Sequence, residues 1–208
     1  MSSLKNTPVL KIDPSRPNIR HISFAAKVIR DGGLVAFPTE TVYGLGANLL
    51  NKRAIANLYK VKARPGSKPF TVHIATLHTI RRMGCHLKKE ALALAKKFWP
   101  GPLTMVLKTK GGRKIGFRMP DHKAALKLIK LSRVPVVAPS ANLSGHPAPK
   151  NAREVLKDLG GRIDLLLDGG RTSIGTESTV VDLTVTPHKI LREGAIKSNE
   201  IANILNYE

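Results

Sequence analysis

The stretch LVAFPTETVYGLGA, residues 34–47, indicates the type of fold more clearly than any other part of the chain. Its first four residues are apolar and stop at Pro38, which predicts a buried β-strand. Glycines let a ligand approach the backbone, and hydroxyls both donate and accept hydrogen bonds. The stretch continues with such residues, namely Thr39, Thr41, Tyr43, Gly44 and Gly46. It therefore predicts a ligand-contacting loop after a strand, although it lacks the spacing of a phosphate loop or a dinucleotide loop.

Outward from this stretch, short apolar runs alternate with segments of helical spacing. Helices are expected over 18–31, 52–62, 87–98, 122–132 and 151–159, with short ones after Thr76 and from Ser198. Strands are expected over 34–37, 70–75, 103–108, 115–119, 134–138, 165–168, 179–183 and 188–192. This alternation predicts an α/β fold with a mixed sheet covered by helices. Because no internal repeat is present, we expect one domain over 17–208 after an extended arm at 1–16.

The chain has a formal net charge of +21, and this charge is concentrated in its middle. Residues 41–153 contain 23 Lys or Arg and only two acidic residues, Glu90 and Asp121. A basic surface of this kind either keeps the protein soluble or forms a groove that collects phosphates. Both readings stay open on charge alone.

The single cysteine, Cys85, excludes a disulfide framework and is typical of a reducing compartment. No stretch reaches the ~18 apolar residues of a membrane span. The N-terminal segment has Lys and Asp where a signal peptide has its apolar core. We therefore expect a cytoplasmic protein without membrane contact.

Two short polar motifs follow in KVKARPGSKPF (60–70) and VVAPSANLSG (136–145). Lys62 at a helix end and Arg64 just before Pro65 can converge on one anion, with Lys68 nearby, although a solvated helix end gives the same pattern. Ser140 and Asn142 lie two apart and share a face in extended backbone. Since no nucleophile elbow surrounds Ser140, polar ligand contacts are favoured over a catalytic triad.

A fourth motif, GTESTVVD at 175–182, leads into an expected strand. His73 lies within an apolar strand, where a core histidine is the ordinary interpretation. The sequence has no paired His or Cys spacing of a zinc site, so no metal ligands are expected in the protein.

These segments, taken in order, resemble the YrdC/TsaC family, the L-threonylcarbamoyladenylate synthases. The motifs that carry the resemblance are FPTETVYGLG, Lys62–Arg64 as a KxR element, FWPGPLT, the SxN element of PSANLSG, ESTVVD and ILREGAI. They span about residues 17 to 196, nearly the whole chain. The resemblance implies a YrdC-like open, twisted mixed sheet with flanking helices and a basic concave face.

The resemblance also implies an activity. The family joins L-threonine, bicarbonate and ATP into threonylcarbamoyladenylate and pyrophosphate, a nucleotidyltransferase reaction. Other proteins then transfer the threonylcarbamoyl group to the adenosine next to the tRNA anticodon. Mg²⁺ is expected, held mainly through the ATP phosphates. The partners are therefore small substrates and a downstream transfer complex, with tRNA or double-stranded RNA on the basic face left open.

Roles carry over from the family motif by motif. The KxR and SxN residues are expected to be catalytic: Lys62, Arg64, Ser140 and Asn142. The threonine site is expected at Thr41, Tyr43, His73, Arg118, Ala138 and Ser178. The ATP site is expected at Arg64, Lys68, Ser140 and Arg192.

Departures and alternatives remain beside the family reading. Lys114 and Ala148 stand where some members have small hydroxyl residues, so ATP contacts there are open. The chain looks like the short form without a further C-terminal domain. A non-catalytic protein that binds double-stranded RNA or tRNA on the same basic surface is the main alternative. A related carbamoyl-adenylate enzyme and a paralogue without activity are two others.

Overall fold

The computed structural model describes residues 6–64, 66 and 69–205. Its strands are β1 (Val9–Lys11), β2 (Val35–Phe37), β3 (Gly44–Asn48), β4 (Val72–His73), β5 (Leu103–Lys108), β6 (Lys114–Arg118), β7 (Val136–Val137), β8 (Leu165–Asp168), β9 (Thr179–Asp182) and β10 (Lys189–Arg192). Its helices are α1 (Ile19–Arg30), α2 (Lys52–Val61), α3 (His78–Arg82), α4 (Lys89–Phe98), α5 (Lys123–Ser132), α6 (Ala152–Leu159) and α7 (Ser198–Leu205).

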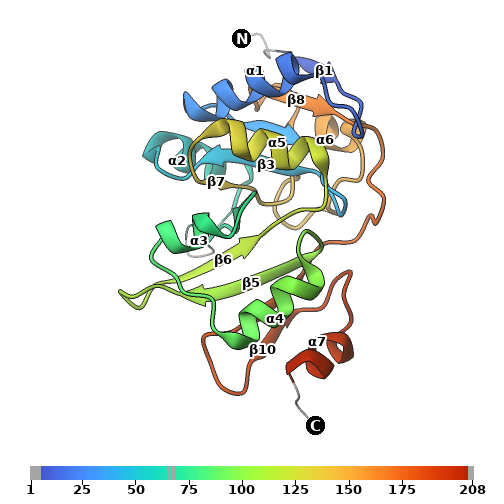
Figure 1. Cartoon of the computed structure of the whole chain (residues 1–208). Helices are drawn as coiled ribbons and strands as arrows, with labels where there is room; N and C mark the ends of the chain where they lie inside the picture. The colour runs from blue at the N-terminus through green and yellow to red at the C-terminus, as the bar shows by residue number, and fades with distance from the viewer. Residues whose placement is uncertain (1–5, 65, 67–68, 206–208) are drawn as a thin grey trace.

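The strands form one open mixed sheet in the order β1-β8-β2-β3-β7-β4-β6-β5-β9-β10. Three neighbouring pairs, β1–β8, β2–β8 and β4–β6, are parallel, as is β5–β9. The other neighbours run antiparallel. In Figure 1, α1 and α5 lie side by side over the β2–β3 end, whereas α4 and α7 lie at the β5–β10 end. The expected α/β fold with an open sheet and flanking helices is confirmed.

Side chains alternate between two hydrophobic cores because successive residues of a strand point to opposite faces. Val35 and Phe37 of β2 pack under α1 and α5, whereas Ala36 belongs to the larger core on the other face. Leu165 and Leu167 repeat this pattern on β8. Both faces of the central strands are therefore buried, which explains why LVAF is apolar without alternation.

Two strands occur where the sequence does not predict them. Residues 44–48, expected as part of a loop, form β3 and pair with β2 and β7. The segment has two glycines and no β-branched residue, so its strand propensity is low and tertiary pairing overrides it. A Cβ at Gly46 would lie 3.0 Å from Phe37 and 3.1 Å from Ile29. Gly46 therefore serves packing, not the approach of a ligand.

The second unpredicted strand is β1, which lies in the expected N-terminal arm. Val9–Lys11 pairs in parallel with β8 and forms one edge of the sheet. The division into an arm at 1–16 and a domain at 17–208 stays a prediction. Among the described residues, no helix is long and apolar enough to cross a membrane.

Candidate functional site

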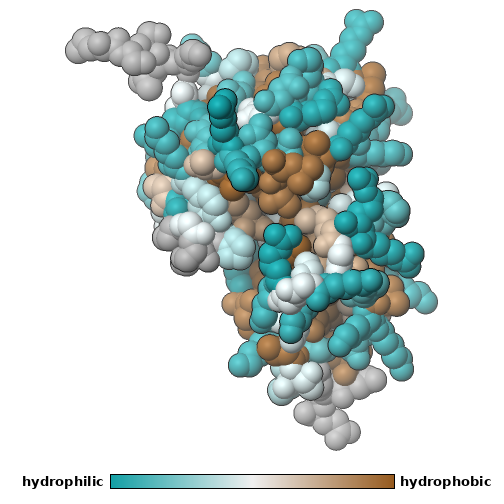
Figure 2. Space-filling view, turned by 90° about the vertical axis from the view of Figure 1, so that its left-hand side faces the viewer, coloured by the Kyte–Doolittle hydropathy of each residue, from teal (hydrophilic) through white to brown (hydrophobic). Residues whose placement is uncertain are grey.

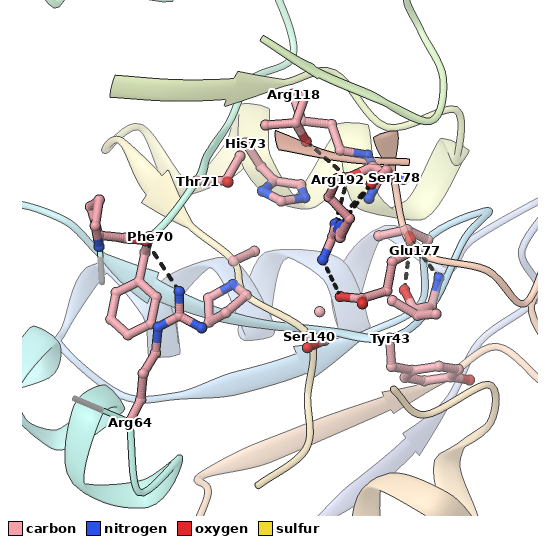
Figure 3. A pocket seen from close by; sticks show the side chains of 17 residues that line it. Tyr43, Arg64, Phe70, Thr71, His73, Arg118, Ser140, Glu177, Ser178 and Arg192 are labelled. Carbon is pink, nitrogen blue, oxygen red and sulfur yellow. Dashed lines mark hydrogen bonds and ion pairs between the residues drawn. The ribbon is translucent and has the colours of Figure 1, made fainter. Parts of the chain in front are cut away.

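Segments that are far apart in the sequence meet around a cavity of about 120 Å³ (Figure 3). The lining comes from the β2–β3 loop, from β4, β5 and β6, from the turn after β7, and from the segments beside β9 and β10. It includes eight of the residues predicted from the sequence: Tyr43, Arg64, His73, Arg118, Ala138, Ser140, Ser178 and Arg192. We call Thr41, His73, Arg118 and Ser178 the inner wall, because all four are buried. We call Arg64, Ser140, Glu177 and Arg192 the mouth.

The β2–β3 loop is shaped by its own threonines. The Thr39 hydroxyl donates to the Val42 carbonyl at 2.6 Å and accepts from the backbone N–H groups of Thr41 and Val42. The Thr39 and Thr41 hydroxyls lie 3.0 Å apart. These local bonds hold the loop so that Thr41, itself fully buried, reaches Arg118 behind the cavity surface.

Arg118 ends β6 and makes a buried ion pair that the sequence does not reveal. Its guanidinium donates to Glu40 Oε1 and to Thr41 Oγ1, each at 2.7 Å. Burial lowers the pKa of Arg118, and the charge of Glu40 opposes that effect. Arg118 Nε and Glu40 Oε2 have no hydrogen-bond partner among the described residues. The pair therefore retains unused hydrogen-bonding capacity beside the cavity.

His73 of β4 lies next to Arg118 through the β4–β6 register. Burial, together with the charge of Arg118, lowers its pKa to about 3, so the imidazole is neutral near pH 7. Its Nδ1 atom has no hydrogen-bond partner in the described part of the chain. His73 was expected to be either a core histidine or a threonine contact. The structure gives it both a buried ring, edge-on to Phe37, and a place in the cavity wall.

Ser178 and Arg192 connect the inner wall to the mouth. The Ser178 hydroxyl lies 2.9 Å from that of Thr104, and its carbonyl accepts from both Nε and NH2 of Arg192. Arg192 NH1 donates to Glu177 Oε1 at 2.7 Å. Figure 3 shows the Glu177 carboxylate below the tip of Arg192, on the side of Ser140 and Tyr43.

Arg64 follows the end of α2, after Ala63 in the left-handed region at φ 48°. Its guanidinium lies 5.2 Å from the centroid of the Phe70 ring and donates to the Pro69 carbonyl at 3.4 Å. The Phe70 ring in turn packs on Tyr59, with centroids 4.3 Å apart. The aromatic pair thus supports a cation at the mouth. Lys68, expected beside Arg64, lies outside the described residues.

Lys62 and Asn142 do not line the cavity, although they belong to the KxR and SxN elements. The buried Lys62 ammonium donates to the carbonyls of Ser140 and Asn142 and to Asn142 Oδ1. A lysine has three N–H donors, so these contacts use all of them. The Lys62 carbonyl accepts from Ser144 N at 2.8 Å. Lys62 therefore connects the end of α2 to the loop that carries Ser140. The expected catalytic role of Lys62 and Asn142 stays a prediction.

Tyr43 lines the cavity with its ring, while its hydroxyl points to another part of the chain. The hydroxyl donates to the Gly170 carbonyl at 2.7 Å and accepts from Gly169 N at 3.1 Å. Burial raises its pKa. Ala138 also lines the cavity, and its N–H donates to the Thr71 carbonyl at 3.1 Å. Both residues therefore give the cavity its shape.

Two carboxylates of the site, Glu40 and Glu177, are absent from the sequence-based set. Each is the acidic residue of its own motif, in PTETVY and in TESTV, within a chain that has 35 basic residues. An acid flanked by hydroxyl residues, close to a predicted strand, is the signal that could have identified them. No cluster of three or more His, Cys, Asp or Glu that could hold a metal occurs among the described residues.

A second and larger hollow, of about 1130 Å³, adjoins the mouth at Phe70. Figure 2 shows the face of the molecule that lies on the left in Figure 1. Apolar side chains gather in the middle of that face, with hydrophilic ones around them. Basic residues in its lining include Arg82, Arg113, Lys130 and Arg133. Nothing tests whether RNA binds at these or other basic residues, so that alternative stays a prediction.

A known family profile, Sua5/YciO/YrdC, described as telomere recombination, matches residues 27–194. The chain belongs to this family. The recognition made from the motifs is confirmed.

Relatives of the family share most of this chain. The threonylcarbamoyl-AMP synthase of Pyrococcus abyssi (strain GE5 / Orsay) is 47% identical over 193 residues, which cover 88% of this chain and 57% of the relative. The putative threonylcarbamoyl-AMP synthase of Mycobacterium tuberculosis (strain H37Rv) is 33% identical, with 94% of both chains covered. The crystal structure of P. abyssi Sua5 complexed with L-threonine superposes with a TM-score of 0.90 at 44% identity, covering 96% of this chain and 61% of that one. The chain thus spans little more than half of the P. abyssi protein.

Proposed function

We propose that the chain joins L-threonine, bicarbonate and ATP into L-threonylcarbamoyladenylate and releases pyrophosphate. The observation that carries this proposal is a small cavity lined by hydroxyls and three arginines, in a chain similar to a Sua5 protein crystallised with L-threonine. At about 120 Å³ the cavity is close to the ~150 Å³ site that accommodates benzene. It therefore suits a ligand of a few heavy atoms and is too small for a nucleotide.

The inner wall is the proposed threonine site. Arg118 would bind the substrate carboxylate with the donors that Glu40 leaves unused, and its planar guanidinium suits this geometry. The neutral His73 and the hydroxyl of Ser178 offer donors and acceptors for the threonine hydroxyl. Thr41 lies behind the cavity surface and would act through its hydrogen bond to Arg118. Tyr43 and Ala138 limit the size of the side chain that fits. The family pattern supports the same assignment.

The mouth is the proposed site of the ATP phosphates. The threonine ammonium first gives up a proton to water, and the resulting amine and bicarbonate form a carbamate with loss of water. A carbamate oxygen then attacks the α-phosphorus, and the bond to the bridging oxygen breaks as pyrophosphate leaves. Arg64 and Arg192, with the Ser140 hydroxyl, would stabilise the negative charge that builds on the phosphate oxygens. Lys68 is expected to add a further cation.

Mg²⁺ is proposed to reach the site bound to ATP, where it would neutralise phosphate charge. The described residues fit this view, because their cavity lining contains one carboxylate, Glu177, and no cage of acidic side chains. The proposed setting is the cytoplasm, where the adenylate would pass to a transfer complex that modifies the adenosine beside the tRNA anticodon. Direct binding of tRNA to the basic surface belongs to the same hypothesis.

The test is an incubation of the protein with ATP, Mg²⁺, L-threonine and bicarbonate, followed by mass spectrometry. We expect a product of the mass of threonylcarbamoyladenylate together with pyrophosphate, and neither when any one substrate is omitted. L-Serine and L-valine in place of threonine measure the contributions of the methyl group and the hydroxyl. Pyrophosphate release from ATP without threonine, or no product from protein that binds ATP, would contradict the proposal.

A further inference from the structure

The cavity has an uneven set of charges. Its described lining contains three guanidinium groups, those of Arg64, Arg118 and Arg192, and one carboxylate, that of Glu177. Glu40 lies behind the lining, with its side chain only 7% exposed and one oxygen bound to Arg118. An amino acid brings an ammonium as well as a carboxylate, and three arginines repel an ammonium. The site therefore needs a nearby anion to bind a zwitterion.

Glu177 is held in a fixed position at the mouth. Its backbone carbonyl accepts from Ala195 N at 3.0 Å, and the next carbonyl, of Ser178, accepts two bonds from Arg192. A Cβ at Gly194 would lie 2.2 Å from the Glu177 carbonyl oxygen, so the two segments pack with no room for a side chain there. These contacts fix the backbone at Glu177, whose side chain belongs to the cavity lining.

Among the described residues, the Glu177 carboxylate makes one ion pair, with Arg192 at 2.7 Å. The two side chains are 39% and 41% exposed, so water screens this pair and makes it weak. Arg192 uses NH1 for Glu177 but Nε and NH2 for Ser178. The ion pair with Glu177 can therefore break while the hydrogen bonds to Ser178 keep the Arg192 side chain in position.

We propose that Glu177 binds the ammonium group of the amino acid substrate and releases Arg192 NH1 when it does so. This inference rests on the proposed function. Once NH1 is released, it is available to the phosphates of the nucleotide. Binding of the amino acid should therefore strengthen binding of ATP, and by linkage ATP should strengthen binding of the amino acid by the same factor.

The first test is calorimetric titration with L-threonine and with an analogue that has a hydroxyl in place of the amino group. The wild-type chain should prefer threonine. In Glu177→Gln that preference should fall by about 10- to 100-fold, the worth of a hydrogen bond to a charged group, while affinity for the analogue stays unchanged. Glu90→Gln, on the exposed side of α4, makes the same change in charge and should alter neither affinity.

The second test measures the affinity for a non-hydrolysable ATP analogue with and without saturating threonine. Threonine should tighten this binding in the wild-type chain, and the effect should disappear in Glu177→Gln. Circular dichroism and thermal unfolding of each variant verify that it is folded.

The outcomes separate the two proposals. If wild type binds threonine and Glu177→Gln keeps the preference over the analogue, the ammonium assignment is wrong and the proposed function stands. If Glu40→Gln loses the preference instead, the buried carboxylate is the ammonium site. If the wild-type chain binds no amino acid, both proposals fall.

Discussion

The inner wall and the mouth of the cavity differ in how their polar groups are held. In the inner wall, Arg118 and His73 are almost fully buried, and Arg118 is fixed by short bonds to Glu40 and Thr41. At the mouth, Arg64 and Arg192 are partly exposed. Arg64 contacts the Pro69 carbonyl and the Phe70 ring, and Arg192 makes an ion pair with Glu177 that water screens. The inner wall is therefore preorganised for one small ligand, whereas the mouth can exchange partners. Variants at the two places should fail in different ways.

The largest effect is expected at the mouth, from Arg64→Ala. Removing one donor aimed at developing charge lowers turnover by about 10²- to 10³-fold. Stability should fall by no more than about 1 kcal/mol, because the contact with the Phe70 ring is at the surface. Pyrophosphate release and thermal unfolding measure the two quantities. Arg53→Ala, at an exposed position of α2, is the control and should retain full turnover; turnover unchanged in Arg64→Ala would exclude this residue from the reaction.

In the inner wall, Arg118→Ala should affect both binding and folding. The threonine requirement should rise by about 10- to 100-fold, while the ATP requirement changes much less. The free energy of unfolding should fall by about 3–5 kcal/mol, because Glu40 would remain as a buried charge without its partner.

A double variant, Arg118→Met with Glu40→Gln, separates these two effects. It removes both charges, so much of the stability should return while weak threonine binding persists. The measurements are calorimetric titration with threonine and chemical denaturation. Equal increases in the threonine and ATP requirements would contradict the assignment of Arg118 to the threonine site.

The sequence supplied eight of the 17 residues that line the cavity but not their roles within it. The motifs bring Arg64, His73, Arg118, Ser178 and Arg192 together, and the structure agrees. Four of them lie at or beside a strand that the apolar pattern predicts, and Arg64 follows the predicted end of a helix. The sequence pattern does not show which of these side chains are buried and which are exposed. At the end of α2, for example, burial of a side chain depends on which distant segment packs against the helix. The spacing of residues in the sequence does not predict that contact.

Lys62 and Arg64 illustrate this gap, since they are two residues apart and look equivalent in the sequence. In the structure Lys62 is inside, bound to the Ser140 loop, and Arg64 is at the mouth. Strand β3 was missed for a related reason: its glycines read as a loop, and only pairing with β2 and β7 makes it a strand. Local propensity fails where long-range contacts determine the conformation.

The hydrogen bonds from Lys62 to the loop of Ser140 and Asn142 should make activity depend on pH. Over the same pH range, turnover should fall while the free energy of unfolding rises. Burial, with the nearby charge of Arg64, lowers the pKa of Lys62 from 10.5 to about 8. Between these two pH values the unfolded chain holds more protons at this position than the folded chain. This group therefore makes the free energy of unfolding rise with pH in that window. Turnover should fall there, because a neutral amine offers two donors to three loop oxygens.

The test compares pH profiles of turnover and of unfolding for three proteins. Wild type should lose activity as the pH rises through about 8. Lys62→Met should have low activity at every pH, without that alkaline step, because the carbonyls of Ser140 and Asn142 lose their donor. Lys60→Met, at an exposed position two residues before Lys62, should behave as wild type. An alkaline step that persists in Lys62→Met belongs to another group.

The smallest effect is expected from Lys114→Ala, far along β6 from Arg118. Side chains of a strand alternate, so Lys114, Gly116 and Arg118 share one face. Lys114 pairs with Asp182 at 2.9 Å but is 51% exposed, so its loss should cost at most about 1 kcal/mol. If ATP extends from the mouth along this face, its KM should rise a few-fold while that of threonine stays constant. Lys127→Ala, on the exposed side of α5, should change neither value, and a change in the threonine KM of Lys114→Ala would mean that the inner wall and the mouth are not separate sites.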